Sequence, residues 1–227
     1  MKIIFKIQAV CLILIVLSFT VPSKKTTVLF FGDSITRNGV KPDGYIVKMD
    51  SIIKSSNISD SVQLIGGGIN GNKVTDLFLR IEKDVLDKHP DVVVIYIGIN
   101  DVWHKRAYGT GTDLSTFEKF YKIIIEKLKA QNIKVILCTP SVIGERNDQT
   151  NELDGDLNLY ASSIRKIAVE QSLPLCDLRL GFHDYLKAKN PDNVEKGILT
   201  VDRVHLSSSG NLFVAQQLWT EIKKAIK

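Results

Sequence analysis

A serine in residues 28–37, which read VLFFGDSITR, is placed where it could act as a nucleophile. The four leading apolar residues are typical of a short strand buried on both faces, and Gly32 ends the run with a tight turn. The turn would present Ser34 at the carboxyl edge of the strand, where open α/β sheets bind ligands. An ordinary Gly-Asp-Ser turn would have the same sequence, so other stretches must decide.

A glycine-rich stretch follows the next predicted strand, at residues 62–65. Its glycines, at residues 66, 67, 68 and 71, permit positive φ angles and close backbone approach, so their amide hydrogens can point at an anion. Their spacing matches neither a P-loop nor a dinucleotide-binding fingerprint. The stretch is therefore expected to supply backbone donors rather than a nucleotide site.

The strongest strand prediction covers residues 91–97 (DVVVIYI), because a continuous β-branched run is typical of a central strand in a parallel sheet. Asn100 comes directly after this strand, in the sequence GIND. The carboxyl ends of parallel strands lie along one edge of a sheet. Ser34, Gly71 and Asn100 can therefore converge on one crevice despite their separation in sequence.

The rest of the chain alternates between helices and strands. Apolar residues at helical spacing predict helices at residues 44–57, 74–86, 113–128, 151–168 and 207–222. Two further strands are predicted at residues 133–139 and 174–178. This alternation favours a parallel sheet covered on both faces through right-handed crossovers. The predicted fold is therefore α/β, with three layers (α/β/α) and a flavodoxin-like five-stranded parallel sheet.

Two of these helices are predicted in more detail. Asp113 and Ser207 are expected to be the N-caps of the helices that follow them. The last helix is expected to bury the apolar residues of one face, namely Leu212, Ala215, Leu218, Trp219 and Ile222.

The first residues have the layout of a secretory signal peptide. Lys2 and Lys6 precede an uncharged apolar run at residues 7–17, and small residues follow it. The run is shorter than the roughly 20 residues of a membrane-spanning helix, which favours cleavage at residue 20, or as late as residue 23. We expect a secreted or periplasmic protein with residues 21–227 as one domain. An uncleaved leader that anchors the protein to a membrane is the alternative.

The charge of the chain argues against nucleic acid as a partner. Lys and Arg number 30 and Asp and Glu 25, and removal of residues 1–20 takes away two lysines and no acid, lowering the net charge from +5 to +3. The lysines are scattered among acids, as on solvated helix faces. Cys138 and Cys176 each end an apolar run, so buried packing is favoured over a disulfide. Neither has the spacing of a metal site.

Four motifs in order, FGDSIT, GGGINGNKV, GIND and DRVH, resemble the sequence blocks of the SGNH hydrolases, also called the GDSL esterase/lipase family. Each motif is weak alone, but the ordered set is specific and extends over nearly the whole chain after the leader. The resemblance implies Ser34 as nucleophile, His205 as general base and Asp202 as the residue that orients it. It also implies an oxyanion hole made by Ser34, Gly71 and Asn100.

The chemistry of these residue types supports the same roles. A serine hydroxyl needs a neutral imidazole to take its proton, and the imidazole needs a carboxylate to fix its tautomer and stabilise its cation. Asp202 and His205 lie three positions apart, so the acid can reach Nδ1 while Nε2 faces the serine. The developing oxyanion needs several preorganised donors. This set requires no cofactor and no metal, and none is expected.

Other histidines and acids are weighed against these roles. His89, in a loop at the opposite sheet edge, and His183, on a peripheral helix, are predicted at the surface. Trp103 and His104 directly follow GIND and are candidates for a substrate-facing wall, with simple packing as the alternative. Asp33 is a further candidate for substrate binding. Helix capping or hydrogen bonding behind the site is favoured for Asp33 and for Asp101.

Three longer stretches, GINGNKVTDL, GINDVWH and DRVHLSSSG, are similar to the acetylxylan esterase type of SGNH enzyme, which removes acetyl groups from plant polysaccharide. Leu206 departs from the proline that relatives often carry, which affects the stiffness of the loop. The resemblance implies a secreted serine esterase for short-chain, mainly acetyl, esters of carbohydrate, whose substrate is a small molecule or a polysaccharide.

Two other functions are considered, because fold and triad are shared by several kinds of hydrolase. A lysophospholipase or thioesterase acting on longer acyl chains is the alternative enzyme. A non-catalytic carbohydrate-binding protein is disfavoured, because such a protein would have no need of the complete set of five residues. No membrane partner is expected beyond an uncleaved leader, and the oligomeric state is left open.

Overall fold

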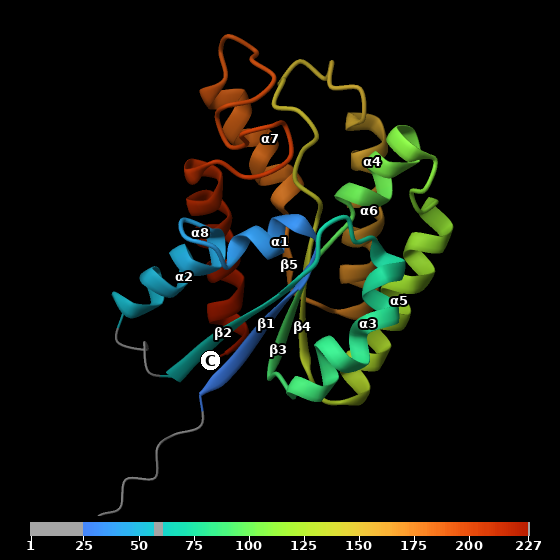
Figure 1. Ribbon diagram of the computed structural model, residues 1–227, viewed down its shortest axis with the longest axis vertical. Helices are drawn as coiled ribbons and strands as arrows, with labels where there is room; N and C mark the ends of the chain where they lie inside the picture. The colour runs from blue at the N-terminus through green and yellow to red at the C-terminus, as the bar shows by residue number, and fades with distance from the viewer. Residues whose placement is uncertain (1–24, 57–60, 227) are drawn as a thin grey trace, which may run out of the picture.

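The computed structural model describes residues 25–56 and 61–226, and its centre is one parallel sheet (Figure 1). The strands lie in the order β2-β1-β3-β4-β5, and every neighbouring pair is parallel. Their bounds are β1 Thr26–Gly32, β2 Val62–Gly68, β3 Val92–Tyr96, β4 Lys134–Cys138 and β5 Leu175–Cys176. The predicted five-stranded parallel sheet is confirmed.

Helices cover both faces of this sheet, which gives the predicted three layers. Their bounds are α1 Ser34–Gly39, α2 Tyr45–Lys54, α3 Val74–Asp84, the 3₁₀ turn η2 Leu86–Lys88, α4 Ile99–Tyr108, α5 Leu114–Ala130, α6 Asp154–Gln171, α7 Leu178–Lys189 and α8 Ser208–Ala225. The helices α2 and α8 pack together over one face, and α3, α5 and α6 cover the other (Figure 1).

The register of the three strands at the site brings their carboxyl ends level. Gly32, the last residue of β1, pairs with Gly68 of β2 on one side and with Tyr96 of β3 on the other. The side chains of Phe31 and Ile95 just before these ends are fully buried. Backbone hydrogen bonds and packing together prevent the strands from sliding, because a shift of one residue would turn buried side chains to the opposite face.

The glycine-rich stretch differs from its prediction. The second strand was expected to end at residue 65, but β2 continues through three glycines to Gly68. A Cβ atom on Gly68 would lie 2.1 Å from the backbone nitrogen of Arg37, and one on Gly66 would lie 2.3 Å from Cγ1 of Val40. These glycines therefore permit close packing of the α1 segment on β2. Gly71, with φ +73°, lies in the turn that follows.

Helix α4 and two details of other elements were also not foreseen. The sequence INDVWHKRAY forms α4, although only its first four residues are buried, which leaves little helical periodicity to detect. Strand β5 has two residues instead of five. Leu212, the fifth residue of α8, is 42% exposed, because the buried face of the helix runs through Gly210 and Val214 instead. The other four predicted core residues of α8 are buried, and both N-caps, Asp113 and Ser207, are confirmed.

Cys138 and Cys176, the two cysteines within the described residues, are free and buried at the ends of neighbouring strands. Cys138 of β4 pairs in register with Cys176 of β5, and burial raises the pKa of the Cys138 thiol. This agrees with the predicted packing role.

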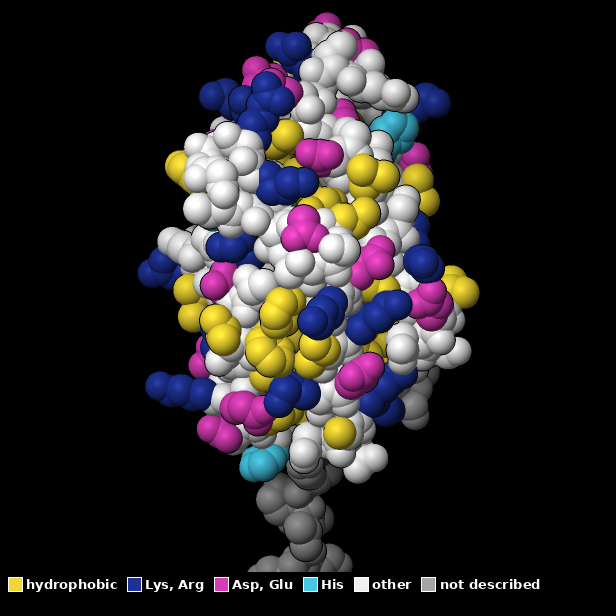
Figure 2. Space-filling view, turned by 90° about the vertical axis from the view of Figure 1, so that its right-hand side faces the viewer, with side chains coloured by type: hydrophobic (Ala, Val, Ile, Leu, Met, Phe, Trp, Pro, Cys, Tyr) yellow, Lys and Arg dark blue, Asp and Glu magenta, His cyan; other side chains and the backbone are white. Residues whose placement is uncertain are grey.

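The outer face of the α3 and α5 layer carries charges of both signs around apolar side chains (Figure 2). Ion pairs link its helices: Lys127 of α5 pairs with Glu82 of α3, and Lys122 of α5 pairs with Glu170 of α6. Each such exposed pair contributes about 1 kcal/mol or less. Among residues 25–56 and 61–226, no helix has the length and apolar character needed to cross a membrane. The predicted leader at residues 1–20 lies outside these ranges.

The close packing of α1 on β2 predicts the effect of a single methyl group. Gly68→Ala places Cβ against backbone atoms of the α1 segment, so the free energy of unfolding should fall by about 2 to 3 kcal/mol. Gly155→Ala in α6 is the control, because no atom lies within 4 Å of its added Cβ, and its stability should stay level or rise by about 0.5 kcal/mol. Urea denaturation measures the free energy of unfolding of both variants. Equal values for Gly68→Ala and Gly155→Ala would contradict the packing argument.

Candidate active site

The proposed nucleophile lies at the start of α1, directly after β1. Asp33 is the N-cap of this helix, and its carboxylate accepts a hydrogen bond of 2.9 Å from the backbone N–H of Ile35. The side chain of Asp33 is nearly inaccessible, since the residue is 2% exposed. Asp33 thus holds the turn that presents Ser34. The capping bond is sufficient to explain an aspartate at this position, and no contact with substrate is needed.

An imidazole lies against this serine. Nε2 of His205 is 3.0 Å from Oγ of Ser34, across 171 positions of sequence. Nδ1 of the same ring is 2.7 Å from Oδ2 of Asp202. This order of hydroxyl, imidazole and carboxylate can pass a proton from the serine to the ring while the acid stabilises the resulting cation.

The carboxylate of Asp202 is held by its own segment. Its Oδ1 accepts hydrogen bonds from the backbone N–H groups of His205, at 2.7 Å, and Val204, at 3.1 Å. Partial burial acts to raise the pKa of Asp202, but the bonds from the side chain and backbone of His205 and from Val204 outweigh it and lower the pKa. The acid is therefore ionised near neutral pH, as a partner for the imidazole must be.

Gly71 and Asn100, the two residues besides Ser34 predicted to form an oxyanion hole, lie on two segments that contact each other. Gly71 adopts φ +73° in the turn after β2, and Asn100 lies in the first turn of α4 after β3. The Asn100 side chain donates a hydrogen bond of 3.1 Å to the carbonyl oxygen of Asn72, which fixes it beside that turn. An Asn amide has two N–H donors, so the same group can also donate to a substrate oxygen.

Arg80 of α3, which sequence reasoning missed, connects the two halves of this arrangement. Its guanidinium donates to the carbonyl oxygens of Gly32, at 2.8 Å, and Gly67, at 2.9 Å, and to Oδ1 of Asn72 at 2.7 Å. The guanidinium also lies over the ring of Phe31, 4.5 Å from its centroid. The ends of β1 and β2 and the turn that carries Gly71 are thereby held together. Arg80 lies nine positions after Gly71, and nothing in that spacing indicated such a role.

Comparison of the chain with known protein families identifies its family. The GDSL-like lipase/acylhydrolase family matches residues 30–212 of the chain. The protein belongs to this family. It is a carboxylic ester hydrolase, and the resemblance inferred from its four motifs is confirmed.

Relatives of this GDSL-family hydrolase include several named enzymes. An acetylxylan esterase from Geobacillus stearothermophilus is 30% identical over 214 residues, 86% of this chain and 92% of that protein. The crystal structure of the acetyl xylan esterase AlAXEase is 55% identical, with a TM-score of 0.84, and the match covers 86% of this chain and 98% of that one. Structures of Axe2 from Geobacillus stearothermophilus include ones described as catalytic mutants, in which a histidine or a serine is replaced by alanine. These two are 27% identical, with a TM-score of 0.77 and coverage of 88% and 94%.

Trp103 and His104 of the GDSL-family hydrolase lie on α4, the helix that also carries Asn100. A Cβ atom on Gly71 would be 3.8 Å from Cε1 of His104, so this ring flanks the turn. Burial and the nearby Lys73 lower the pKa of His104. Trp103 lines a cavity of about 270 Å³ together with Asp202, next to the imidazole.

The remaining histidines lie elsewhere. His89 is exposed and adopts φ +47° after η2, at the edge of the sheet where the strands begin. The side chain of His183, on α7, is 49% exposed. Neither is brought near Ser34, as predicted. Within residues 25–56 and 61–226, no three His, Cys, Asp or Glu side chains gather closely enough to hold a metal ion.

Two buried acids lie behind the site of the GDSL-family hydrolase. Asp101, fully buried, accepts hydrogen bonds of 3.1 and 3.3 Å from the backbone N–H of Val74 at the start of α3. Burial raises the pKa of Asp101 to about 6. Burial raises the pKa of Asp33 to about 7, against the bond from Ile35, and the charge of Asp101 adds to the rise.

These raised values predict how stability depends on pH. An aspartate whose pKa is higher in the folded state binds its proton more tightly there, so the free energy of unfolding falls as pH rises from about 4 to about 7. Asp33→Asn keeps a capping acceptor and removes a group whose pKa rises from 3.8 to about 7. The decrease between pH 4.5 and 7.5 should therefore shrink by about 3 kcal/mol, since one pKa unit corresponds to about 1.4 kcal/mol. Urea denaturation at pH 4.5 and 7.5 measures this change in the free energy of unfolding. Asp192→Asn, at an exposed position, is the control and should keep the wild-type decrease. A decrease of wild-type size in Asp33→Asn would refute the assignment.

Proposed function

We propose that this protein is a serine esterase that removes short acyl groups, acetyl above all, from carbohydrate through an acyl-enzyme intermediate. The observation that carries the proposal is the chain of contacts from Ser34 Oγ through His205 to Asp202, at 3.0 and 2.7 Å. A hydroxyl, an imidazole and a carboxylate in this order are what acyl transfer to serine requires.

The reaction follows from these positions. Oγ of Ser34 attacks the ester carbonyl while Nε2 of His205 takes the hydroxyl proton, and Asp202 stabilises the imidazolium. The carbonyl oxygen becomes an oxyanion held by the backbone N–H groups of Ser34 and Gly71 and the side chain of Asn100. His205 then gives the proton to the leaving sugar oxygen. Water activated by His205 attacks the acyl-enzyme and releases the acid and Ser34.

The relatives support this substrate and this set of residues. Two of the matched enzymes are named acetylxylan esterases, and the 55% identity of one of them extends over 98% of its chain. Structures of Axe2 in which a serine, a histidine or an aspartate is replaced by alanine are described as catalytic mutants. Those are the three residue types assigned here to Ser34, His205 and Asp202.

The cavity beside Asp202 is assigned to the sugar part of the substrate. Its lining combines the indole of Trp103 with polar groups from Arg106, Glu152 and Arg203. An apolar surface with a few polar groups suits a sugar ring, which has apolar faces and hydroxyls around its edge. His104 forms the neighbouring wall beside Gly71. Asp33 is assigned to capping, because its carboxylate is buried and bonded to Ile35.

We also propose that the protein acts outside the cytoplasm. The leader at residues 1–20 supports a secreted or periplasmic enzyme, and a retained leader would instead anchor it to the membrane. Amino-terminal sequencing of the exported protein distinguishes cleavage from retention.

Removal of the nucleophile is the direct test of the mechanism. Ser34→Ala should lower kcat on 4-nitrophenyl acetate by at least about 10⁴-fold, because no acyl-enzyme can form. Its melting temperature should stay near that of the wild type, since only one partly exposed hydroxyl is lost. Ser51→Ala, on α2, is the control and should keep full activity. Turnover by Ser34→Ala at the wild-type rate would refute the assignment.

Truncation of the indole tests the sugar site. Trp103→Ala should raise KM on acetylated xylooligosaccharides by about 10-fold, while kcat/KM on 4-nitrophenyl acetate changes by less than about 3-fold, because the small ester does not reach the cavity. Leu79→Ala is the control, because it removes a side chain of α3 that is 78% exposed and does not line the cavity. Equal losses on both substrates would contradict a sugar-specific role.

A further inference from the structure

Glu145 is a buried carboxylate to which the reaction assigns no role. It lies in the loop between β4 and α6 and is 0% exposed. Its Oε1 accepts hydrogen bonds from the backbone N–H groups of Leu199, at 2.6 Å, and Thr200, and its Oε2 accepts one of 2.8 Å from Ile198. Three consecutive backbone donors therefore converge on one side chain, an arrangement that holds an anion firmly.

The segment held in this way leads directly to Asp202 and His205. Residues 190–207, between α7 and α8, form no helix or strand and contain one isolated bridge, between Thr200 and Leu206. Inside the bridge, the backbone N–H of Val201 donates to the carbonyl oxygen of His205 at 2.8 Å. A segment without regular structure depends on such ties for its position.

The backbone beside Glu145 holds the same segment at two further points. The N–H of Gly144 donates to the carbonyl oxygen of Arg203 at 2.8 Å, and the N–H of Glu145 donates to the carbonyl oxygen of Glu195 at 2.9 Å. Arg203 lies between Asp202 and His205 and adopts φ +85°, which is uncommon for a residue with a side chain. The tip of the segment is thus held in a conformation that its own residues do not favour.

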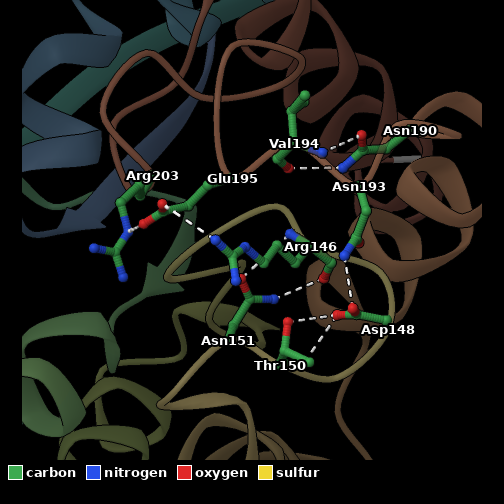
Figure 3. A network of polar contacts seen from close by, with 9 residues as sticks. All are labelled: Arg146, Asp148, Thr150, Asn151, Asn190, Asn193, Val194, Glu195 and Arg203. Carbon is green, nitrogen blue, oxygen red and sulfur yellow. Dashed lines mark hydrogen bonds and ion pairs between the residues drawn. The ribbon is translucent and has the colours of Figure 1, made fainter.

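Side chains around this contact tie the two loops together on their outer side (Figure 3). Glu195 lies between Arg203, whose Nε is 2.6 Å away, and Arg146 at 3.8 Å. Asn193 donates a hydrogen bond of 2.6 Å to Asp148. These groups are more exposed than Glu145, so they contribute less per contact.

We propose that Glu145 is a positioning residue for catalysis: its carboxylate sets the place of the Asp202–His205 segment relative to Ser34. This inference rests on the proposed function. The 3.0 Å contact between His205 and Ser34 joins two elements that are held separately, one by Asp33 and Arg80 at β1, the other by Glu145. A displacement of about 1 Å between reacting groups can lower the rate about 100-fold.

The geometry specifies which substitution is informative. Glutamine has the size of glutamate but offers one acceptor oxygen, so its NH2 group would face a backbone N–H of the 198–200 segment, donor against donor. The segment would have to move to relieve this contact. Aspartate keeps the charge but is shorter by one methylene, so it cannot reach all three donors.

The experiment compares Glu145→Gln with a carboxylate changed elsewhere. Asp177 is the matched control: its carboxylate accepts bonds from Thr139, from the backbone N–H of Leu180 and from Arg165, outside the segment. We expect Glu145→Gln to lower kcat on 4-nitrophenyl acetate by about 10- to 100-fold with KM changed less than about 3-fold. Asp177→Asn should lose stability and keep its kcat.

Folding and positioning are separated by circular dichroism and by the rate at which an organophosphonate labels Ser34. The assays are run at least 15 °C below each variant's melting temperature. If Glu145→Gln does not fold, Glu145→Asp takes its place with the same expectation. A folded variant with wild-type kcat and labelling rate, or a loss that Asp177→Asn shares, would overturn the inference. Failure of the wild type to turn over ester or to be labelled would instead refute the proposed function.

Discussion

The structure depends on the register of three parallel strands. Because Gly32 is level with Gly68 and Tyr96, the segments after β1, β2 and β3 leave the sheet at the same height. Each segment needs only a few residues to bring its functional group to a common point. The buried residues of β1 and β3 and the backbone pairing with β2 make this register difficult to shift, so Ser34, Gly71 and Asn100 follow strands that form a rigid base.

Asp202 and His205 lie on a segment with no regular structure, and the buried carboxylate of Glu145 binds the backbone of this segment just before Asp202. The carboxylate of Glu145 accepts hydrogen bonds from three consecutive backbone N–H groups, of which those of the buried Leu199 and Thr200 would otherwise lack a partner. On the other side of the site, the guanidinium of Arg80 donates hydrogen bonds to the carbonyl oxygens of Gly32 and Gly67. Arg80 thus binds backbone carbonyl groups of β1 and β2, and Glu145 binds backbone N–H groups of the segment that leads to Asp202. The site lies between these two contacts.

Much of this could be predicted from particular residues. Continuous apolar runs located the strands, and side chains that bond to a helix start identified Asp113 and Ser207. The prediction of a residue's role failed where that role depends on contact with residues distant in sequence. Gly66 and Gly68 were read as loop glycines, because their conflict with Val40 and Arg37 exists only once α1 lies on β2. Helix α4 was missed because little of it is buried.

The sequence by itself determined the family, the order of the five strands and of five helices, and the residue types that could perform acyl transfer, because motifs and hydrophobic patterns are local properties of the chain. Only the tertiary structure decided that His205 lies 3.0 Å from a serine 171 positions away, and that Arg80 and Glu145 hold the two halves of the site. Such distances depend on the packing of several elements at once, and no local pattern encodes them.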